Sequence, residues 1–197
     1  DYFWLVLRYF ECFRSLGFTV SIVHKSHDLS GYKIIAMPSL NGLSTEEVEQ
    51  LMSYKAVKIA GPRFLAKDEL FTNYDSRDIL QSYFGVTREH TESLPPGQNF
   101  YSQDGELIFI EYLDKLISKN QSLVNTRENN PIVTKSNGNY YIAANLVPDS
   151  LQSAACLILD DQNIKYSRLP KGVRSHKTNE ITLWTAYCDL KSAMGFD

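Results

Sequence analysis

The sequence predicts a layered α/β domain with a mainly parallel central sheet, followed by a short β segment towards its C-terminus. Three observations support this prediction. Short apolar runs typical of buried strands alternate with segments of helical periodicity, the connections between them are short, and capping or stop residues mark the helix ends. Right-handed crossovers would place helices on both faces of such a sheet, which makes it the middle layer of a three-layer sandwich.

The first half of the chain carries this alternation most clearly. A helix is predicted over residues 2–16, because apolar side chains recur at helical spacing and Gly17 follows as a stop. Ser44 and Glu47 form a capping box that begins a second helix. The other elements expected here are strands over residues 18–23, 32–38 and 56–60 and a helix over Arg77–Phe84, which Gly85 ends.

The second half of the chain has a different pattern. Residues 87–105 are polar and contain Pro95-Pro96-Gly97, whereas residues 106–116 fit either a strand or a helix. A hairpin turn is predicted at Asn137-Gly138. The other expected elements are a helix over residues 149–159 and strands over residues 122–126, 131–135, 139–145, 164–169, 173–177 and 181–188.

The N-terminal helix has more apolar surface than one sheet face needs. Phe3 and Phe10 extend its apolar stripe, and only a narrow strip through Arg8, Glu11 and Ser15 looks solvated. We therefore expect this helix to bury two faces, the second one against another domain or another subunit.

Composition excludes several classes of protein. The 197 residues carry a net charge of −3, so there is no basic field for a nucleic acid. The longest apolar runs are far shorter than the roughly 20 residues of a membrane helix. Cys12, Cys156 and Cys188 are far apart in the sequence and predict buried, reduced thiols. The chain begins without Met or a signal-peptide pattern, so we interpret it as part of a longer, cytoplasmic protein.

The sequence contains no familiar catalytic motif, such as G-x-G-x-x-G, a Walker loop, H-E-x-x-H or G-x-S-x-G. His24 and His27 lie in a polar loop without a third ligand nearby. Three pairs of acids are adjacent in sequence: Glu46-Glu47, Asp68-Glu69 and Asp160-Asp161. Adjacent acids point in different directions, which suits helix caps and solvated faces better than the facing carboxylates of a glycosidase. We therefore expect no catalytic residue, no cofactor-binding residue and no metal ligand.

The carboxyl ends of the predicted strands offer the candidate interaction residues. Parallel strands end at one edge of a sheet, so the loops over residues 38–43 and 61–75 should lie there. Arg63 follows Gly61-Pro62 and could bind a carboxylate across an interface, although a simple surface arginine fits the same pattern. The interface candidates are Leu40, Leu43 and Arg63. The strand ends carry no cysteine, which argues against a nucleophilic amidotransferase enzyme.

Four sequence runs follow one another in a distinctive order: GFTVSIV with DLSGYKIIAMP over residues 17–38, GPR with KDE over residues 61–69, PIVT with YYIA over residues 131–143, and LPKGV over residues 169–173. Their order and spacing resemble family 42 β-galactosidases. Two departures suggest a divergent member. Tyr54-Lys55-Ala56 replaces a longer Gly-Gly turn, and Asn137-Gly138-Asn139 has one glycine where two are usual.

The resemblance implies a flavodoxin-like sandwich, similar to class I glutamine amidotransferases, over residues 1–168. Residues 169–197 would begin a small C-terminal β domain. In that family a barrel with both catalytic glutamates comes first, and the α/β domain builds a trimer. A complete barrel needs about 250 residues, so the chain cannot contain it as well.

The resemblance therefore implies a non-catalytic assembly domain of a β-galactosidase, inactive by itself. Its partners would be its own barrel and further copies in a homotrimer, with the galactoside bound mainly by the barrel. Nucleic acid, membrane and cofactors are not expected. Two other interpretations stay open: a free-standing module that binds a carbohydrate or another small ligand, and an unrelated amidotransferase-like enzyme.

Overall fold

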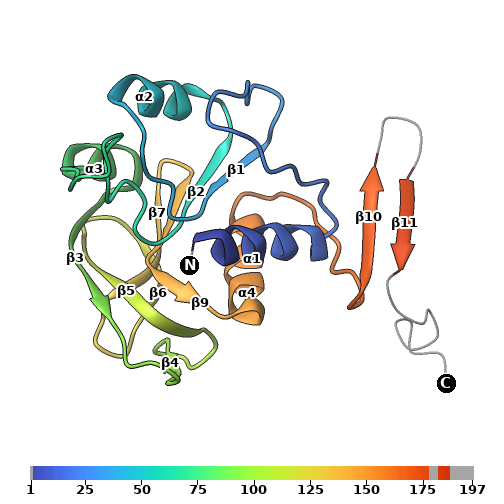
Figure 1. Cartoon of the computed structure of the whole chain (residues 1–197). Coiled ribbons are helices and arrows are strands. Elements are labelled where there is room, and N and C mark those ends of the chain that lie inside the picture. The colour runs from blue at the N-terminus through green and yellow to red at the C-terminus, as the bar shows by residue number, and fades with distance from the viewer. Residues whose placement is uncertain (1, 178–181, 187–197) are drawn as a thin grey trace.

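The computed structural model describes residues 2–177 and 182–186, which form a mixed α/β structure (Figure 1). Its helices are α1 (Tyr2–Ser15), α2 (Thr45–Ser53), α3 (Arg77–Phe84) and α4 (Pro148–Asp161). All four lie where the sequence predicts a helix. None of the helices in the described ranges is long and apolar enough to cross a membrane.

The larger sheet has five strands in the order β1-β2-β8-β7-β6. They are β1 (Ile34–Met37), β2 (Val57–Ala60), β8 (Asn139–Ile142), β7 (Pro131–Ser136) and β6 (Ser122–Asn125). The pairs β1-β2 and β2-β8 are parallel, whereas β8-β7 and β7-β6 are antiparallel. The turn between β7 and β8 is the predicted Asn137-Gly138 pair, in which both residues have positive φ as a type I′ turn requires.

A second sheet contains β3 (Val86–Ser93), β5 (Ile108–Ser118) and β4 (Phe100–Tyr101), and β9 (Ala144–Leu146) also pairs with β5. Every pairing in it is antiparallel. The prediction of a mainly parallel sheet is therefore wrong, because parallel pairing is confined to β1-β2-β8. The polar residues 87–105 include most of β3 and all of β4. Pairing with the long strand β5 orders β3, although most of its side chains are at least partly exposed.

The C-terminal hairpin consists of β10 (Val173–Lys177) and β11 (Thr182–Ala186), paired antiparallel. It stands to one side of the rest of the chain (Figure 1). Arg174 on β10 forms an ion pair with Glu11 on α1. The predicted strand over residues 173–177 is confirmed. The strand predicted over residues 181–188 is confirmed for residues 182–186, and its ends lie outside the described residues.

Helices cover the larger sheet on both sides. Figure 1 shows α1 and α4 together on one side and α2 and α3 on the other. Gln152 on α4 donates a hydrogen bond to Ser15 on α1 at 2.7 Å, which joins the first pair. The largest buried side chains of the sheet belong to its central strands, where Ile59, Tyr140 and Tyr141 are almost completely inaccessible.

Local sequence signals set the helix ends. The side chain of Ser44 accepts the Glu47 amide and the Glu47 side chain accepts the Ser44 amide, so the predicted capping box begins α2. At the end of α1, Gly17 has φ +82° and donates its amide to the Arg14 carbonyl, while Phe18 donates to Phe13. These two bonds form a Schellman motif, and the rings of Phe13 and Phe18 pack edge to face beneath it.

Two predicted strands are wrong. Residues 18–23 form no strand, and Ile22 and Val23 are exposed, so β1 remains an edge of the larger sheet. Residues 164–169 are also irregular. Their backbone amides serve another purpose, because Ser167 donates to the Leu16 carbonyl and Leu169 to the Ser15 carbonyl. These bonds satisfy carbonyl groups that the end of α1 leaves without helical partners.

Candidate functional site

The loops that follow β1 and β2 lie side by side. Leu65 donates its backbone amide to the Leu40 carbonyl at 2.9 Å, and Gly42 donates to Lys67 at 3.2 Å. The Asn41 side chain also accepts the Lys67 amide at 2.8 Å. The predicted meeting of these two loops at the carboxyl ends of the strands is confirmed.

The backbone of both loops is strained. Ser39, Arg63, Leu65 and Phe71 have positive φ values of 52°, 60°, 52° and 59°. Side chains other than glycine avoid this region, and such residues persist only where the surrounding structure enforces them. Strain of this kind gathers at functional sites, which makes these loops the candidate site.

A buried carboxylate enforces the conformation of the second loop. Asp114 on β5 is completely buried and accepts the backbone amide of Arg63 at 2.8 Å. The same carboxylate accepts the hydroxyl groups of Tyr141 at 2.7 Å and Thr91 at 2.6 Å. Burial, and next the charge of Asp114, raise the pKa of Tyr141 well above its usual value, so its hydroxyl stays a donor.

Arg88 on β3 holds the same loop by its carbonyl groups. Its guanidinium donates to the Phe64 carbonyl at 2.8 Å and to the Leu65 carbonyl at 3.2 Å. It lies 4.0 Å from the Asp114 carboxylate and is itself about nine-tenths buried. The second sheet thus supplies a buried ion pair that binds three successive residues of the loop.

Arg63 projects outward from this fixed backbone. Its guanidinium carbon lies 5.9 Å from the centre of the Tyr112 ring, a cation–π contact. Tyr112 also lines a hollow of about 190 Å³. The other residues that line it are Trp4, Leu5, Arg8, Glu111 and Asn145.

Polar side chains form the floor of this hollow. Arg8 donates to the Asn145 side chain at 2.6 Å and to the Leu146 carbonyl at 2.8 Å, and Asn145 donates to Glu111 at 2.7 Å. The sequence predicted that Arg8 lies on a solvated strip. This prediction is wrong, because its guanidinium binds Asn145 and the Leu146 carbonyl. Trp4 stands at the rim with 62% of its surface exposed.

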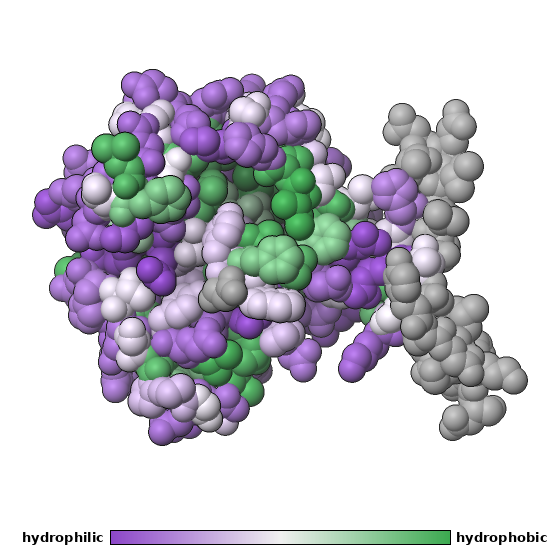
Figure 2. Space-filling view, in the orientation of Figure 1, coloured by the Kyte–Doolittle hydropathy of each residue, from purple (hydrophilic) through white to green (hydrophobic). Residues whose placement is uncertain are grey.

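Large apolar side chains are exposed around the same loops and α1. Figure 2 shows hydrophobic side chains near the centre of this face, over α1 and the segment after it, with a smaller group at its left edge. The first turn of α1 and the loop over residues 61–75 contribute Tyr2, Phe3, Trp4, Leu70 and Phe71, each with more than half of its surface exposed.

The three predicted interface residues differ in accessibility. Arg63 is exposed and Leu40 is half-buried, so both reach the surface beside the strained loops. Leu43 is 2% exposed and packs in the core, where it supports the loop and offers no contact surface. Sequence reasoning missed Asp114, Arg88 and Tyr112. The available signal was an acid inside the apolar run of β5, a position that needs buried partners.

Comparison with known families identifies this arrangement. The family model described as the β-galactosidase trimerisation domain matches residues 1–165. The chain belongs to this family of trimerisation domains. A search of curated protein sequences finds no match.

Solved β-galactosidases share the fold of this trimerisation domain. The enzyme from the psychrophilic Marinomonas ef1 superposes with a TM-score of 0.86 at 23% identity, covering 95% of this chain and 29% of that chain. The enzyme from the haloarchaeon Halorubrum lacusprofundi has a TM-score of 0.82 at 23% identity, and the match covers 94% of this chain and 30% of that chain. The β-galactosidase from Bacillus circulans has a TM-score of 0.77 at 16% identity, and the match covers 93% of this chain and 31% of that chain. The chain therefore spans about 30% of the length of these structures.

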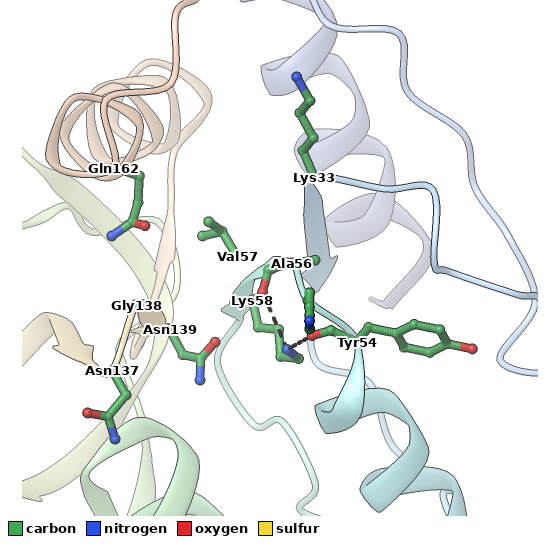
Figure 3. Close-up of a pocket in the computed structure, with 10 residues that line it drawn as sticks. Lys33, Tyr54, Ala56, Val57, Lys58, Asn137, Gly138, Asn139 and Gln162 are labelled. Carbon is green, nitrogen blue, oxygen red and sulfur yellow. Dashed lines mark hydrogen bonds between the residues drawn. The ribbon is translucent and has the colours of Figure 1, made fainter.

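A second hollow lies at the opposite, amino ends of β1, β2 and β8 of the trimerisation domain (Figure 3). It measures about 480 Å³ and is lined partly by Lys33, Lys55 and Lys58. Lys58 is buried, which lowers the pKa of its amine, and it donates to the Tyr54 and Ala56 carbonyls at 2.6 and 3.3 Å. None of the three predicted interface residues lies there.

The paired acids of the trimerisation domain have structural partners. Glu47 caps α2 and binds Lys25 at 2.7 Å, and Asp161 binds Lys135 at 2.7 Å. Asp68 accepts the Leu70 and Thr72 amides of its own loop at 3.0 and 2.8 Å. Among the described residues, no group of three or more acids, histidines or cysteines could hold a metal ion.

Proposed function

We propose that this trimerisation domain is the non-catalytic assembly part of a β-galactosidase, and that α1 and the strand-end loops form its contact with other copies. The single observation that supports this most is the strained loop over residues 61–75, in which Asp114 binds the Arg63 amide while Leu70 and Phe71 are exposed. A preset backbone lowers the ordering cost of association. The exposed apolar side chains supply the burial that drives it.

The partners follow from this proposal. The copies would form a homotrimer with closed symmetry, and a catalytic barrel of the same enzyme would bind the galactoside. A stable contact should bury on the order of 1,200–2,000 Å² in total. We also propose that residues 169–197 begin a small β domain, that β1, β2 and β8 with their helices keep a flavodoxin-like core, and that the protein is cytoplasmic.

Charged residues placed in the proposed contact test it. In the complete enzyme, Trp4→Asp, Leu40→Asp and Arg63→Glu should each lower the mass measured by light scattering at micromolar concentration. Ile117→Asp is the matched control, because Ile117 is 52% exposed on β5 outside the strained loops. Leu43→Asp is unsuitable, since a charge in the core would unfold the domain. If all three variants keep the mass and activity of the parent enzyme, the proposed contact is wrong.

The chain by itself should hydrolyse no galactoside. Glu47 caps α2 and binds Lys25, Asp161 binds Lys135, and Asp68 binds amides of its own loop, so none of these three acids is poised as one of the two facing carboxylates of a glycosidase. Purified chain should release no chromophore from a nitrophenyl galactoside. Turnover that follows the chain through purification and disappears with the denatured chain would overturn this expectation.

The hollow beside Trp4 favours a second candidate function, the binding of a carbohydrate. An exposed indole next to a carboxylate, an amide and a guanidinium can stack on a sugar ring and bind its hydroxyl groups. Titration of the chain with galactose or lactose, followed by Trp fluorescence and calorimetry, tests this function. Saturable binding that Trp4→Ala and Glu111→Gln both abolish would support it, and absence of heat at millimolar sugar would exclude it.

A further inference from the structure

We propose that the buried pair of Asp114 and Arg88 is a positioning device: it fixes residues 61–65 so that Arg63 is presented as a preset arm for a carboxylate on a neighbouring copy of the chain. The inference rests on the proposed assembly function and names the chemistry of the contact. It also assigns a role to two buried residues that do not reach the surface.

The Asp114–Arg88 pair binds both amide and carbonyl groups of the loop backbone. Asp114 accepts the amide of Arg63, and Arg88 donates to the next two carbonyl groups, those of Phe64 and Leu65. Both charged residues come from the antiparallel second sheet, whereas the loop continues the parallel strand β2. The loop is thus held by a sheet other than the one to which its own strand belongs.

The side chains around Arg63 prevent the loop from relaxing. Phe64 and Leu65 are completely buried, and Phe64 packs edge to face on Phe84. Arg63 is the exposed residue of this segment, and its positive φ turns the side chain outward. A strained backbone of this kind costs stability and persists because Asp114 and Arg88 compensate it.

The guanidinium of Arg63 has no carboxylate partner among the described residues. Several other cations at the surface do have one: Lys25, Arg77, Lys115, Lys135 and Arg174. Arg63 instead lies over the ring of Tyr112, which orients the planar group and leaves its donors available. A planar guanidinium on a rigid backbone can bind a carboxylate by two parallel hydrogen bonds. The chain carries 23 Asp and Glu residues, so a second copy supplies carboxylates.

Hydrogen exchange on the full chain tests the positioning role without any assembly. Asp114→Asn keeps the size of the side chain but replaces an accepting oxygen with an NH₂ group. We expect the amides of residues 63–65 to exchange about tenfold faster or more, while those of α4 keep their rates. Thr91→Val is the matched control, because it removes another hydrogen bond to the same carboxylate and does not touch the loop. Equal loop exchange in the parent chain and the Asn variant would overturn the positioning role.

A double-mutant cycle in the complete enzyme tests the arm. We expect Arg63→Ala to weaken assembly by about 10-fold to 100-fold in the parent background and by less than about threefold beside Asp114→Asn. Arg63→Lys should weaken assembly less than Arg63→Ala but more than the parent residue, since a lysine ammonium lacks the planar geometry for two parallel hydrogen bonds. An equal effect of Arg63→Ala in both backgrounds would overturn the coupling between the Asp114–Arg88 pair and Arg63.

The outcomes separate this inference from the proposed function. If Trp4→Asp dissociates the enzyme and Arg63→Ala does not, the arm is refuted while the assembly function stands. If none of the variants changes the mass of the enzyme, the proposed contact through α1 and the strand-end loops fails. In that case the exchange measurement still decides whether Asp114 and Arg88 hold the loop.

Discussion

The carboxylate of Asp114 accepts the backbone amide of Arg63 at 2.8 Å, although 51 positions separate the two residues in the sequence. The bond joins the second sheet to the loop that follows β2. It connects the interior of the domain with the surface that we propose for assembly.

Removal of this carboxylate should be strongly destabilising. In Asp114→Ala, Arg88 is left buried without a counter-charge, and the Tyr141 hydroxyl loses its acceptor. We expect a loss of about 3–5 kcal/mol in the free energy of unfolding, measured by urea denaturation. Thr91→Val should cost less, about 1.5–3 kcal/mol, because it removes one hydrogen bond to the carboxylate and leaves the ion pair intact. Similar losses for both variants would show that the ion pair has no special weight.

Asp161 should make stability depend on pH in the acid range. Hydrogen bonds from Lys135, and next from Tyr140, lower the pKa of this carboxyl below its ordinary 3.8. A lowered pKa means that the stabilisation is present above pH 3.8 and is lost as the pH falls through the folded-state value. The parent chain should exceed Asp161→Asn by about 0.2–1 kcal/mol at pH 6, and the difference should shrink towards zero at lower pH. A difference that grows on acidification contradicts the assignment.

Gly85 ends α3 and should not accept a side chain. Its φ is +65°, and a Cβ atom there would lie 1.7 Å from the Asn120 side-chain nitrogen. Gly85→Ala should lower the free energy of unfolding by about 1–2 kcal/mol, from the left-handed backbone and the clash together. Asn120→Ala in the same chain should recover the part due to the clash. If the double variant is no more stable than Gly85→Ala, the cost belongs entirely to the backbone.

Cys12 should be protected from alkylation in the folded chain. Burial, and next the neighbouring Cys156, raise the pKa of its thiol to about 12. At pH 8 roughly one molecule in ten thousand would carry the reactive thiolate. Peptide mapping after iodoacetamide treatment should find Cys12 unmodified in buffer and modified in urea. Rapid labelling in buffer would mean that α1 opens locally.

Local sequence was sufficient wherever a short-range interaction decides the structure. The capping box at Ser44, the stop at Gly17 and the turn at Asn137-Gly138 involve groups within a few positions of one another, and all three form as predicted. The strands β1 and β2 also form where their apolar runs predict them, and they pair in parallel as expected. The free cysteines Cys12 and Cys156 are buried as expected, whereas Cys188 lies outside the described residues.

Strand propensity failed where a segment's hydrogen-bonding partner decides its conformation. Residues 18–23 are rich in β-forming side chains, yet they join no sheet. Residues 86–93 are polar, yet they form β3 because β5 pairs with them. Propensity measures how a side chain fits a pleated, half-buried surface, and it does not say whether a neighbouring strand is present.

The sequence by itself determined the family resemblance, the helices, and the meeting of the two strand-end loops that carry Leu40 and Arg63. Only the tertiary structure decided that Leu43 is buried, that the second sheet is antiparallel, and that Asp114 and Arg88 hold the Arg63 loop. The physical reason is the range of the interactions. Periodicity and capping act between near neighbours, whereas a buried carboxylate takes its partners from strands and loops that only the folded chain brings together.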